Sequence, residues 1–214
     1  MNEKALSETP TRQRRKEARP AEIMAAALDV FVERGFAVTK LDDVAARAGV
    51  SKGTLYLYFS SKEELFKAVI QQGILPVLEQ AEEMLAQHRG DTATLLRALV
   101  NHWWQVVGKT KLAGILKLII SESGNFPEVA RYFHENVGKG IDELLGKVLQ
   151  SGIEKGEFRP VDVESAIDAI VAPILMRAIW EYSIAPYCNY GQKDSELYLR
   201  TNIDLLLNGL LVKE

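Results

Sequence analysis

The apolar positions of this chain recur mostly at the three- and four-residue spacing of helices. One such stripe, with Ile23, Ala27 and Phe31, lies between Pro20, which suits the first turn of a helix, and Gly35, which suits its end. Two short helical patterns follow, separated by Gly49 and the next residue. No alternating pattern of useful length appears, so the sequence predicts an all-α fold.

The rest of the chain carries longer helical patterns. We expect a helix from Lys62 to about Gln87, bent near Gly73 and Pro76. Further helices are predicted over residues 96–107, 112–119, 129–148, 162–184 and 194–211. This pattern divides the chain into a basic, partly disordered arm (1–19), a three-helix domain (20–67) and a helical body (68–214).

The segment from Thr39 to residue 62 has the layout of a helix-turn-helix. Thr39 is expected to cap the first short helix, and Gly49 can take the left-handed conformation that ends it. Ser51 can cap the second helix, whose inward face carries Leu55 and Phe59. In this motif the second helix enters the major groove of double-stranded DNA. The residues expected to contact DNA are Lys40, Ser51, Lys52, Gly53, Thr54, Tyr56, Tyr58 and Lys62, with Gly53 approaching through its backbone.

This segment resembles the TetR family of transcriptional repressors. The matching string runs from Phe31 to Phe66, FVERGFAVTKLDDVAARAGVSKGTLYLYFSSKEELF, and keeps the family's A-x-x-A-G-V-S-x-G-T-h-Y-x-Y-F core. The resemblance implies that Tyr56, Tyr58 and Lys62 contact phosphates, with residues 52–54 nearest the bases. It also implies a homodimer and a palindromic operator. Lys40, where a small hydroxyl residue is frequent, is the departure that could alter phosphate contacts.

One literal motif favours a different class of protein. Residues 49–53 match G-x-S-x-G, in which a hydrolase places its nucleophilic serine after a strand. Here the residues before Ser51 have a helical pattern, and no alternation of strands and helices surrounds them. We therefore expect no catalytic residue and no enzymatic activity.

Charge is distributed unevenly along the chain. The net charge is −3, but residues 1–67 hold 12 Lys or Arg against 10 Asp or Glu, so the acidic excess lies in the body. The densest basic run is in residues 12–19, which either stays a solvated tail or wraps around phosphates. Because the acidic excess lies outside residues 1–67, the net negative charge of the chain does not argue against DNA binding by this part.

Other simple signals exclude several classes of protein. Cys188 is the single cysteine, no secretion signal is evident and no apolar run is long enough to cross a bilayer, so we expect a cytoplasmic protein. His88, His102 and His134 do not cluster, so neither a metal site nor a cofactor is expected.

The last two long helices carry more apolar surface than one small body can bury. The helix over 162–184 is apolar on more than one side, and the helix over 194–211 has a wide leucine stripe. Pairing of these two helices across a two-fold axis would bury both, and it would place two recognition helices about 34 Å apart on DNA. A larger monomeric core is the alternative.

The aromatic residues of the body favour a small-molecule pocket between the helices, although many of them would serve equally well in an ordinary core. The residues selected for this pocket are His102, Trp103, Phe133, His134, Met176 and Trp180. The sequence thus predicts a homodimeric repressor released from its operator by a small, lipophilic or aromatic ligand. The alternatives are a helical interaction module and a transcriptional activator without an inducer.

Overall fold

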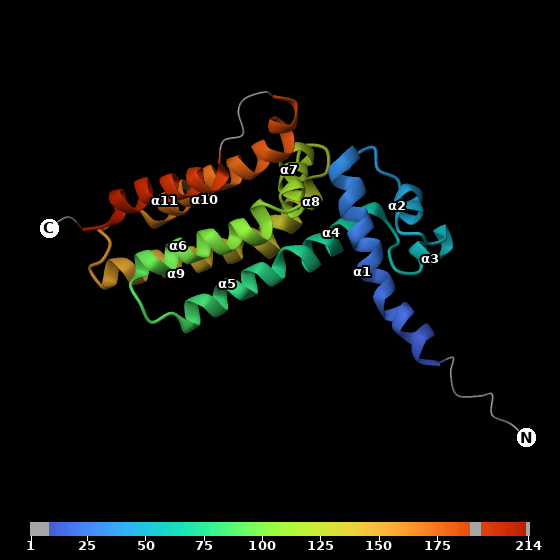
Figure 1. Ribbon diagram of the computed structural model, residues 1–214, viewed down its shortest axis with the longest axis horizontal. Coiled ribbons are helices and arrows are strands. Elements are labelled where there is room, and N and C mark those ends of the chain that lie inside the picture. The colour runs from blue at the N-terminus through green and yellow to red at the C-terminus, as the bar shows by residue number, and fades with distance from the viewer. Residues whose placement is uncertain (1–8, 189–193, 213–214) are drawn as a thin grey trace, which may run out of the picture. The chain divides into compact units, whose positions relative to one another are not determined.

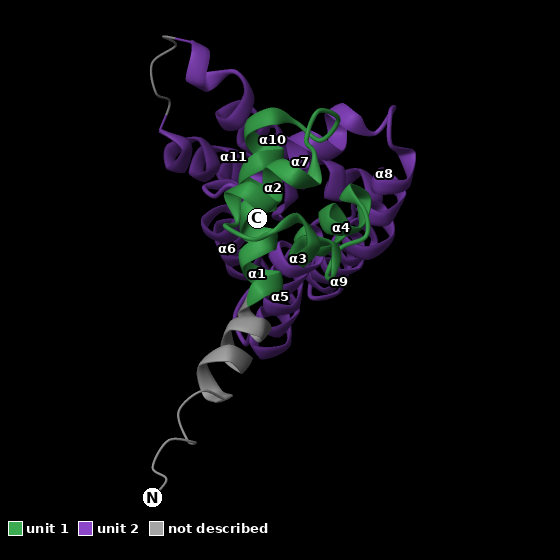
Figure 2. Ribbon diagram, turned by 90° about the vertical axis from the view of Figure 1, so that its right-hand side faces the viewer, with its two compact units in different colours: residues 1–69 green, residues 70–214 purple. Residues whose placement is uncertain are grey.

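The computed structural model describes residues 9–188 and 194–212, with side chains from residue 19 onward. It is 79% helical, and the described residues form no strand, which confirms the all-α prediction. The chain divides into two compact units, residues 1–69 and 70–214 (Figure 2). The boundary predicted after residue 67 falls inside a helix that contributes to both units.

The first unit contains four helices (Figure 1). They are α1 (Thr9–Arg34), α2 (Leu41–Arg47), α3 (Lys52–Tyr56) and the first part of α4 (Lys62–Gly73). The prediction that the first helix begins at Pro20 was wrong, because α1 begins at Thr9 and contains Pro20. Residues 12–19 are mostly Arg, Gln, Lys, Glu and Ala, which favour helix strongly enough to continue it on the N-terminal side of the proline. The remainder of the predicted arm, residues 1–8, lies outside the described residues.

The second unit begins with the end of α4 and is built from helices that pack in pairs and triplets. They are α5 (Leu75–Gln87), α6 (Thr92–Trp103), α7 (Leu112–Glu122), α8 (Pro127–Phe133), α9 (Lys139–Glu154), α10 (Val163–Ser183) and α11 (Ser195–Leu210). Helices α5, α6 and α9 pack against one another, and α10 packs against α7, α9 and α11 (Figure 1). The predicted bend between Gly73 and Pro76 is a complete break at Ile74, and the proline occupies the first turn of α5, where its missing N–H is tolerated.

Two helices of this unit change their winding. Residues Trp104–Gly108 continue α6 as a π-helical turn, and His134–Gly138 form a second π-helical turn between α8 and α9. A π-helical turn inserts an extra residue and is uncommon, often occurring at functional sites. The helix predicted over residues 129–148 is therefore divided into α8, this second turn and the first part of α9.

The core of the second unit is formed mainly by α6, α9, α10 and α11, and Trp104 and Phe158 are its largest fully buried side chains. Phe158 follows α9, where Gly156 has a φ of 72° that favours glycine. None of the described helices is long and apolar enough to cross a membrane.

Packing against Phe158 leaves no room for a side chain at one glycine of α9. A Cβ at Gly152 would lie 2.3 Å from Cδ2 of the buried Phe158 ring, whereas a Cβ at Gly146 would meet Ile167 at an ordinary 4.0 Å. We expect Gly152→Ala to lower the free energy of unfolding by about 1–3 kcal/mol because the ring must move. Gly146→Ala, the control in the same helix, should be neutral or stabilising by up to about 1 kcal/mol. Urea unfolding of both variants tests this, and equal midpoints would contradict it.

Candidate nucleic-acid interface and apolar cavity

The helix-turn-helix is held by a small aromatic core. Phe31 of α1, Phe36 of the following turn and Phe66 of α4 are buried, with ring centroids 5.0–5.5 Å apart. Leu55 and Phe59, from α3 and the turn after it, are also buried, as the sequence predicted for the inward face. With these side chains buried, the opposite side of α3 is left to solvent.

The turn between α2 and α3 has the geometry that its residues predict. Gly49 has a φ of 65°, and the next residue donates its backbone N–H to the carbonyl of Ala45 at 3.0 Å. Ser51 caps α3, because its Oγ accepts a hydrogen bond from the backbone N–H of Thr54 at 3.1 Å. The two hydroxyl groups of Ser51 and Thr54 lie 2.8 Å apart.

The start of α2 differs from the prediction. The N-cap residue is Lys40, and its backbone N–H donates to Oδ2 of Asp43 at 3.4 Å. Thr39 is buried and instead donates its hydroxyl to the carbonyl of Gly35 at 2.6 Å, closing the turn after α1. Thr39 therefore stabilises the turn after α1 instead of capping α2.

The exposed side of α3 carries Lys52, Gly53 and Tyr56. Nζ of Lys52 forms an ion pair with Oδ2 of Asp42 on α2 at 3.0 Å and lies 5.9 Å from the centre of the Tyr56 ring. The hydrogen bond to Asp42 and the charge of that carboxylate raise the pKa of Lys52, so the ammonium is charged at neutral pH. Ser51 and Lys40 are also exposed, and Thr54 and Tyr58 are partly buried.

Lys62 has a structural role that its sequence position does not reveal. Its Nζ donates hydrogen bonds to the carbonyls of Phe36 and Ala37 at 2.8 and 2.9 Å, and lies 4.6 Å from the centre of the Phe36 ring. The side chain therefore ties the start of α4 to the turn after α1. A phosphate contact from Lys62 stays a prediction.

Two apolar side chains near this surface were missed in the sequence. Leu57, directly after α3, is 83% exposed, and Val38, before α2, is 65% exposed. The helical period places residue 57 away from the inward pair Leu55 and Phe59, so the sequence pattern could have predicted that Leu57 is exposed. Exposed apolar groups on a recognition helix can contact the methyl group of thymine.

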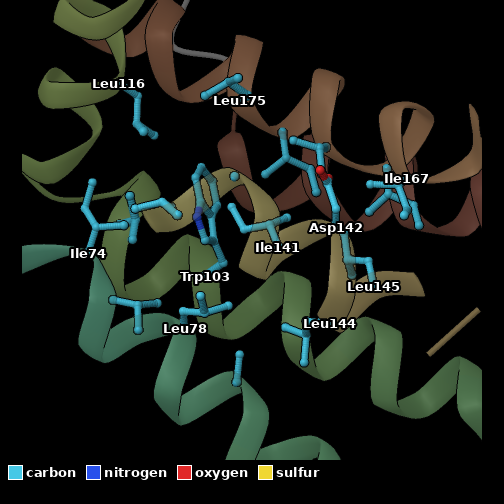
Figure 3. Close-up of a pocket in the computed structure, with 18 of the residues that line it drawn as sticks. Ile74, Leu78, Trp103, Leu116, Ile141, Asp142, Leu144, Leu145, Ile167 and Leu175 are labelled. Carbon is cyan, nitrogen blue, oxygen red and sulfur yellow. The ribbon is translucent and has the colours of Figure 1, made fainter. Parts of the chain in front are cut away.

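The second unit contains a partly open cavity of about 270 Å³ between helices α5, α6, α7, α9 and α10. Its walls are mostly leucine, isoleucine and valine, and Trp103 extends among them (Figure 3). Both π-helical turns reach it, the first through Val107 and the second through Val137 and Gly138. The irregular winding thus coincides with the hollow in the core.

The structure brings together half of the predicted ligand residues. His102, Trp103 and Phe133 line the cavity, whereas His134, Met176 and Trp180 are not among its lining residues. His134 is exposed, and Met176 and Trp180 lie on the outer side of α10, 60% and 37% exposed. The inner side of α10 lines the cavity through residues such as Ile170 and Ile174.

Three polar side chains line this apolar cavity. Nε2 of His102 is buried without a hydrogen-bond partner among the described residues. Asp142 of α9 and Asp168 of α10 complete the set, and both are exposed at the edge of the cavity. The sequence analysis did not select these two carboxylates. An aspartate on an amphipathic helix gives the same sequence pattern at the edge of a cavity as on an ordinary solvated face.

Family comparisons match both units. Residues 23–69 match the model described as "Bacterial regulatory proteins, tetR family". Residues 86–185 match the model described as "Tetracyclin repressor-like, C-terminal domain".

Individual proteins agree with these models. A Bacillus subtilis protein described as the uncharacterized HTH-type transcriptional regulator YfiR is 33% identical over 148 residues, covering 68% of this chain and 71% of its own. The Bacillus subtilis fatty acid metabolism regulator protein is 25% identical, covering 91% and 98%. The crystal structure of the Bacillus subtilis regulator FadR in complex with stearoyl-CoA has a TM-score of 0.75 at 24% identity, covering 88% and 98%.

Proposed function

The chain belongs to the TetR family of bacterial transcriptional regulators, and we propose that it is a homodimeric repressor that leaves a palindromic operator when a small lipophilic or aromatic ligand occupies its cavity. The observation that carries this proposal is the division of α3 into two faces. Leu55 is fully buried, while Lys52 and Tyr56 are exposed on a short, capped helix. This is the arrangement that a recognition helix needs, because its packing leaves the opposite side chains available to DNA.

The proposed DNA contacts fall into two groups. Tyr56, Tyr58 and Lys62 would position the protein on phosphates, and Lys40 adds a positive charge nearby. The residues nearest the base edges would be Lys52, Gly53 and Thr54, with Ser51 at the start of the helix. Phosphate contacts give salt-dependent affinity, whereas base contacts give sequence preference. We add Leu57 to these residues, because its exposed side chain suits a thymine methyl group.

The ion pair between Lys52 and Asp42 leads us to expect opposite changes in operator affinity when each partner is replaced. Lys52→Ala should weaken binding to the operator at least about ten-fold, because it removes a contact with a base edge. Asp42→Asn should tighten binding by about two- to five-fold, because it frees the ammonium and removes a negative charge that repels phosphate. Fluorescence anisotropy on a duplex selected by the wild-type protein from a random library measures both.

The control is Lys155→Ala, which removes an exposed lysine at the end of α9 and should leave operator affinity unchanged. The role of Lys52 is refuted if Lys52→Ala binds as tightly as the wild type. Weaker binding by Asp42→Asn would mean that the ion pair positions Lys52 rather than competes with DNA.

The proposed dimer rests on apolar surface that the isolated chain leaves in water. The outer side of α10 exposes Met176, Trp180 and Ile184, and α11 exposes Leu197 and Leu205. Helices α10 and α11 pack against each other, so these side chains belong to one pair of helices (Figure 1). A four-helix arrangement of two such pairs about a two-fold axis would bury them.

We expect the double substitution Met176→Glu and Leu205→Glu to convert the dimer into monomers, because each introduces a charge into the proposed apolar interface. Sedimentation velocity at micromolar concentration measures the change in mass. Leu57→Glu, which alters an exposed leucine of the first unit, should remain dimeric. A dimeric double variant with unchanged stability would overturn the proposed interface.

The ligand part of the proposal rests on the cavity. It is apolar, has few polar groups and is bounded by aromatic residues, which are common features of small-molecule sites. The solved FadR structure with stearoyl-CoA supports the idea that this fold can hold a lipophilic ligand. In this chain, a ligand would lower operator affinity only to the extent that it binds the DNA-free conformation more tightly than the DNA-bound conformation.

Fluorescence distinguishes the cavity from other places where a ligand could bind. A lipophilic compound that releases the operator should change the tryptophan emission, because Trp103 lines the cavity. The change should persist in Trp180→Phe, whose parent side chain lies on the outer face of α10, and should be lost in Trp103→Phe. The reverse result would place the ligand on that outer face instead.

A further inference from the structure

The polar groups of the cavity carry information about the charge of its ligand. We propose that the cavity selects an organic cation, a protonated amine attached to a small apolar body, and that Asp142 and Asp168 recognise its charge. This inference rests on the proposed function, because it names the ligand class for the same cavity. It differs from the acyl-CoA bound by the related FadR structure, whose phosphates are anionic.

The first observation is the one-sided charge of the lining. Two carboxylates, Asp142 and Asp168, line the cavity, and none of the described lining residues is lysine or arginine. A carboxylate or phosphate on a ligand would therefore meet like charge, and an ammonium group opposite charge, although both aspartates are exposed and water weakens the effect. The residues that line the cavity thus favour one sign of ligand.

The second observation is that neither carboxylate has a partner. Among the described residues, no hydrogen bond or ion pair involves Asp142 or Asp168. Figure 3 shows Asp142 extending from α9 on the side of the cavity where Ile167 of α10 lies. The two aspartates line the same cavity and come from helices that pack against each other.

The ordinary explanation for an aspartate near the start of a helix is the helix dipole, and it does not account for this pair. The start of α9 continues directly from the second π-helical turn, so Asp142 does not stand at a free helix end. In α10 the free N-terminus is already capped by Asp162, which accepts from the backbone N–H of Ser165 at 2.9 Å. Asp168 lies beyond the first turn, where the dipole effect has faded.

The remaining lining residues suit the same ligand. The faces of Trp103 and Phe133 are electron-rich surfaces over which a cation is attracted. The buried Nε2 of His102, in the tautomer that leaves it unprotonated, can accept a hydrogen bond from an amine. A volume of about 270 Å³ falls just below the range of about 300–1,000 Å³ typical of ligand pockets, which indicates a small molecule.

The test uses three eight-carbon probes that differ in charge: octylammonium, octanol and octanoate. Isothermal titration calorimetry with the 214-residue protein should give affinities in the order octylammonium, octanol, octanoate, with the first and last separated by about ten-fold or more. In the double variant Asp142→Asn and Asp168→Asn, the preference for octylammonium over octanol should fall by about three- to ten-fold. Binding of octanol should change little, which shows that the cavity remains intact.

A matched control separates local charge from the charge of the whole protein. The double variant Glu135→Gln and Glu143→Gln removes two exposed carboxylates of the second π-helical turn and α9 that do not line the cavity. It should keep the full preference for octylammonium. Loss of the preference in this control to the same extent as in the aspartate variant would overturn the assignment.

Other outcomes distinguish this inference from the proposed function. If octanol or octanoate binds at least as tightly as octylammonium and releases the operator, the ligand-responsive repressor stands and the cation preference is wrong. If none of the three probes binds, the cation preference is also wrong, and the cavity loses its main support as a ligand site.

Discussion

The aromatic cluster of Phe31, Phe36 and Phe66 is the contact on which the first unit depends. Helix α3 has five residues and α2 has seven, and helices of this length are not stable in water by themselves. Helix α2 packs against α1, and α3 packs against α2, while the three rings join α1 to α4. Lys62 reinforces this junction through the carbonyls of Phe36 and Ala37. Because these contacts bury the inner side of α3, its outer side is presented in a fixed orientation.

The second unit meets a different constraint, since close packing normally leaves little empty volume in a helical core. Here α6 and α8 each pass into a π-helical turn, and residues from both turns line the cavity. A π-helical turn shifts the register of the residues after it, so neighbouring helices cannot interlock as regularly. The hollow is therefore a consequence of backbone winding as well as of side-chain size.

The sequence predicted the helix-turn-helix well because its signals are local. A glycine with positive φ, a serine cap and an inward Leu55 are all set by neighbours within a few residues. The contacts of Lys62 with residues 36 and 37 join distant positions, and no helical period encodes them. The cavity was harder for the same reason. Helix α10 is apolar on two sides, and periodicity alone could not tell that Ile174 faces the cavity while Met176 faces solvent.

The path along the chain from the aromatic cluster to the cavity is short. Phe66 belongs to the cluster, Ile74 lines the cavity, and α4 connects them until it ends at Gly73. A Cβ at Gly73 would lie 2.5 Å from Leu112 of α7, so the end of this helix is closely packed. On the proposed function, a ligand beside Ile74 acts at the junction where α4 ends and α5 begins. The coupling to DNA would then be set by how differently the ligand fits the two conformations of that junction, rather than by how tightly it binds overall.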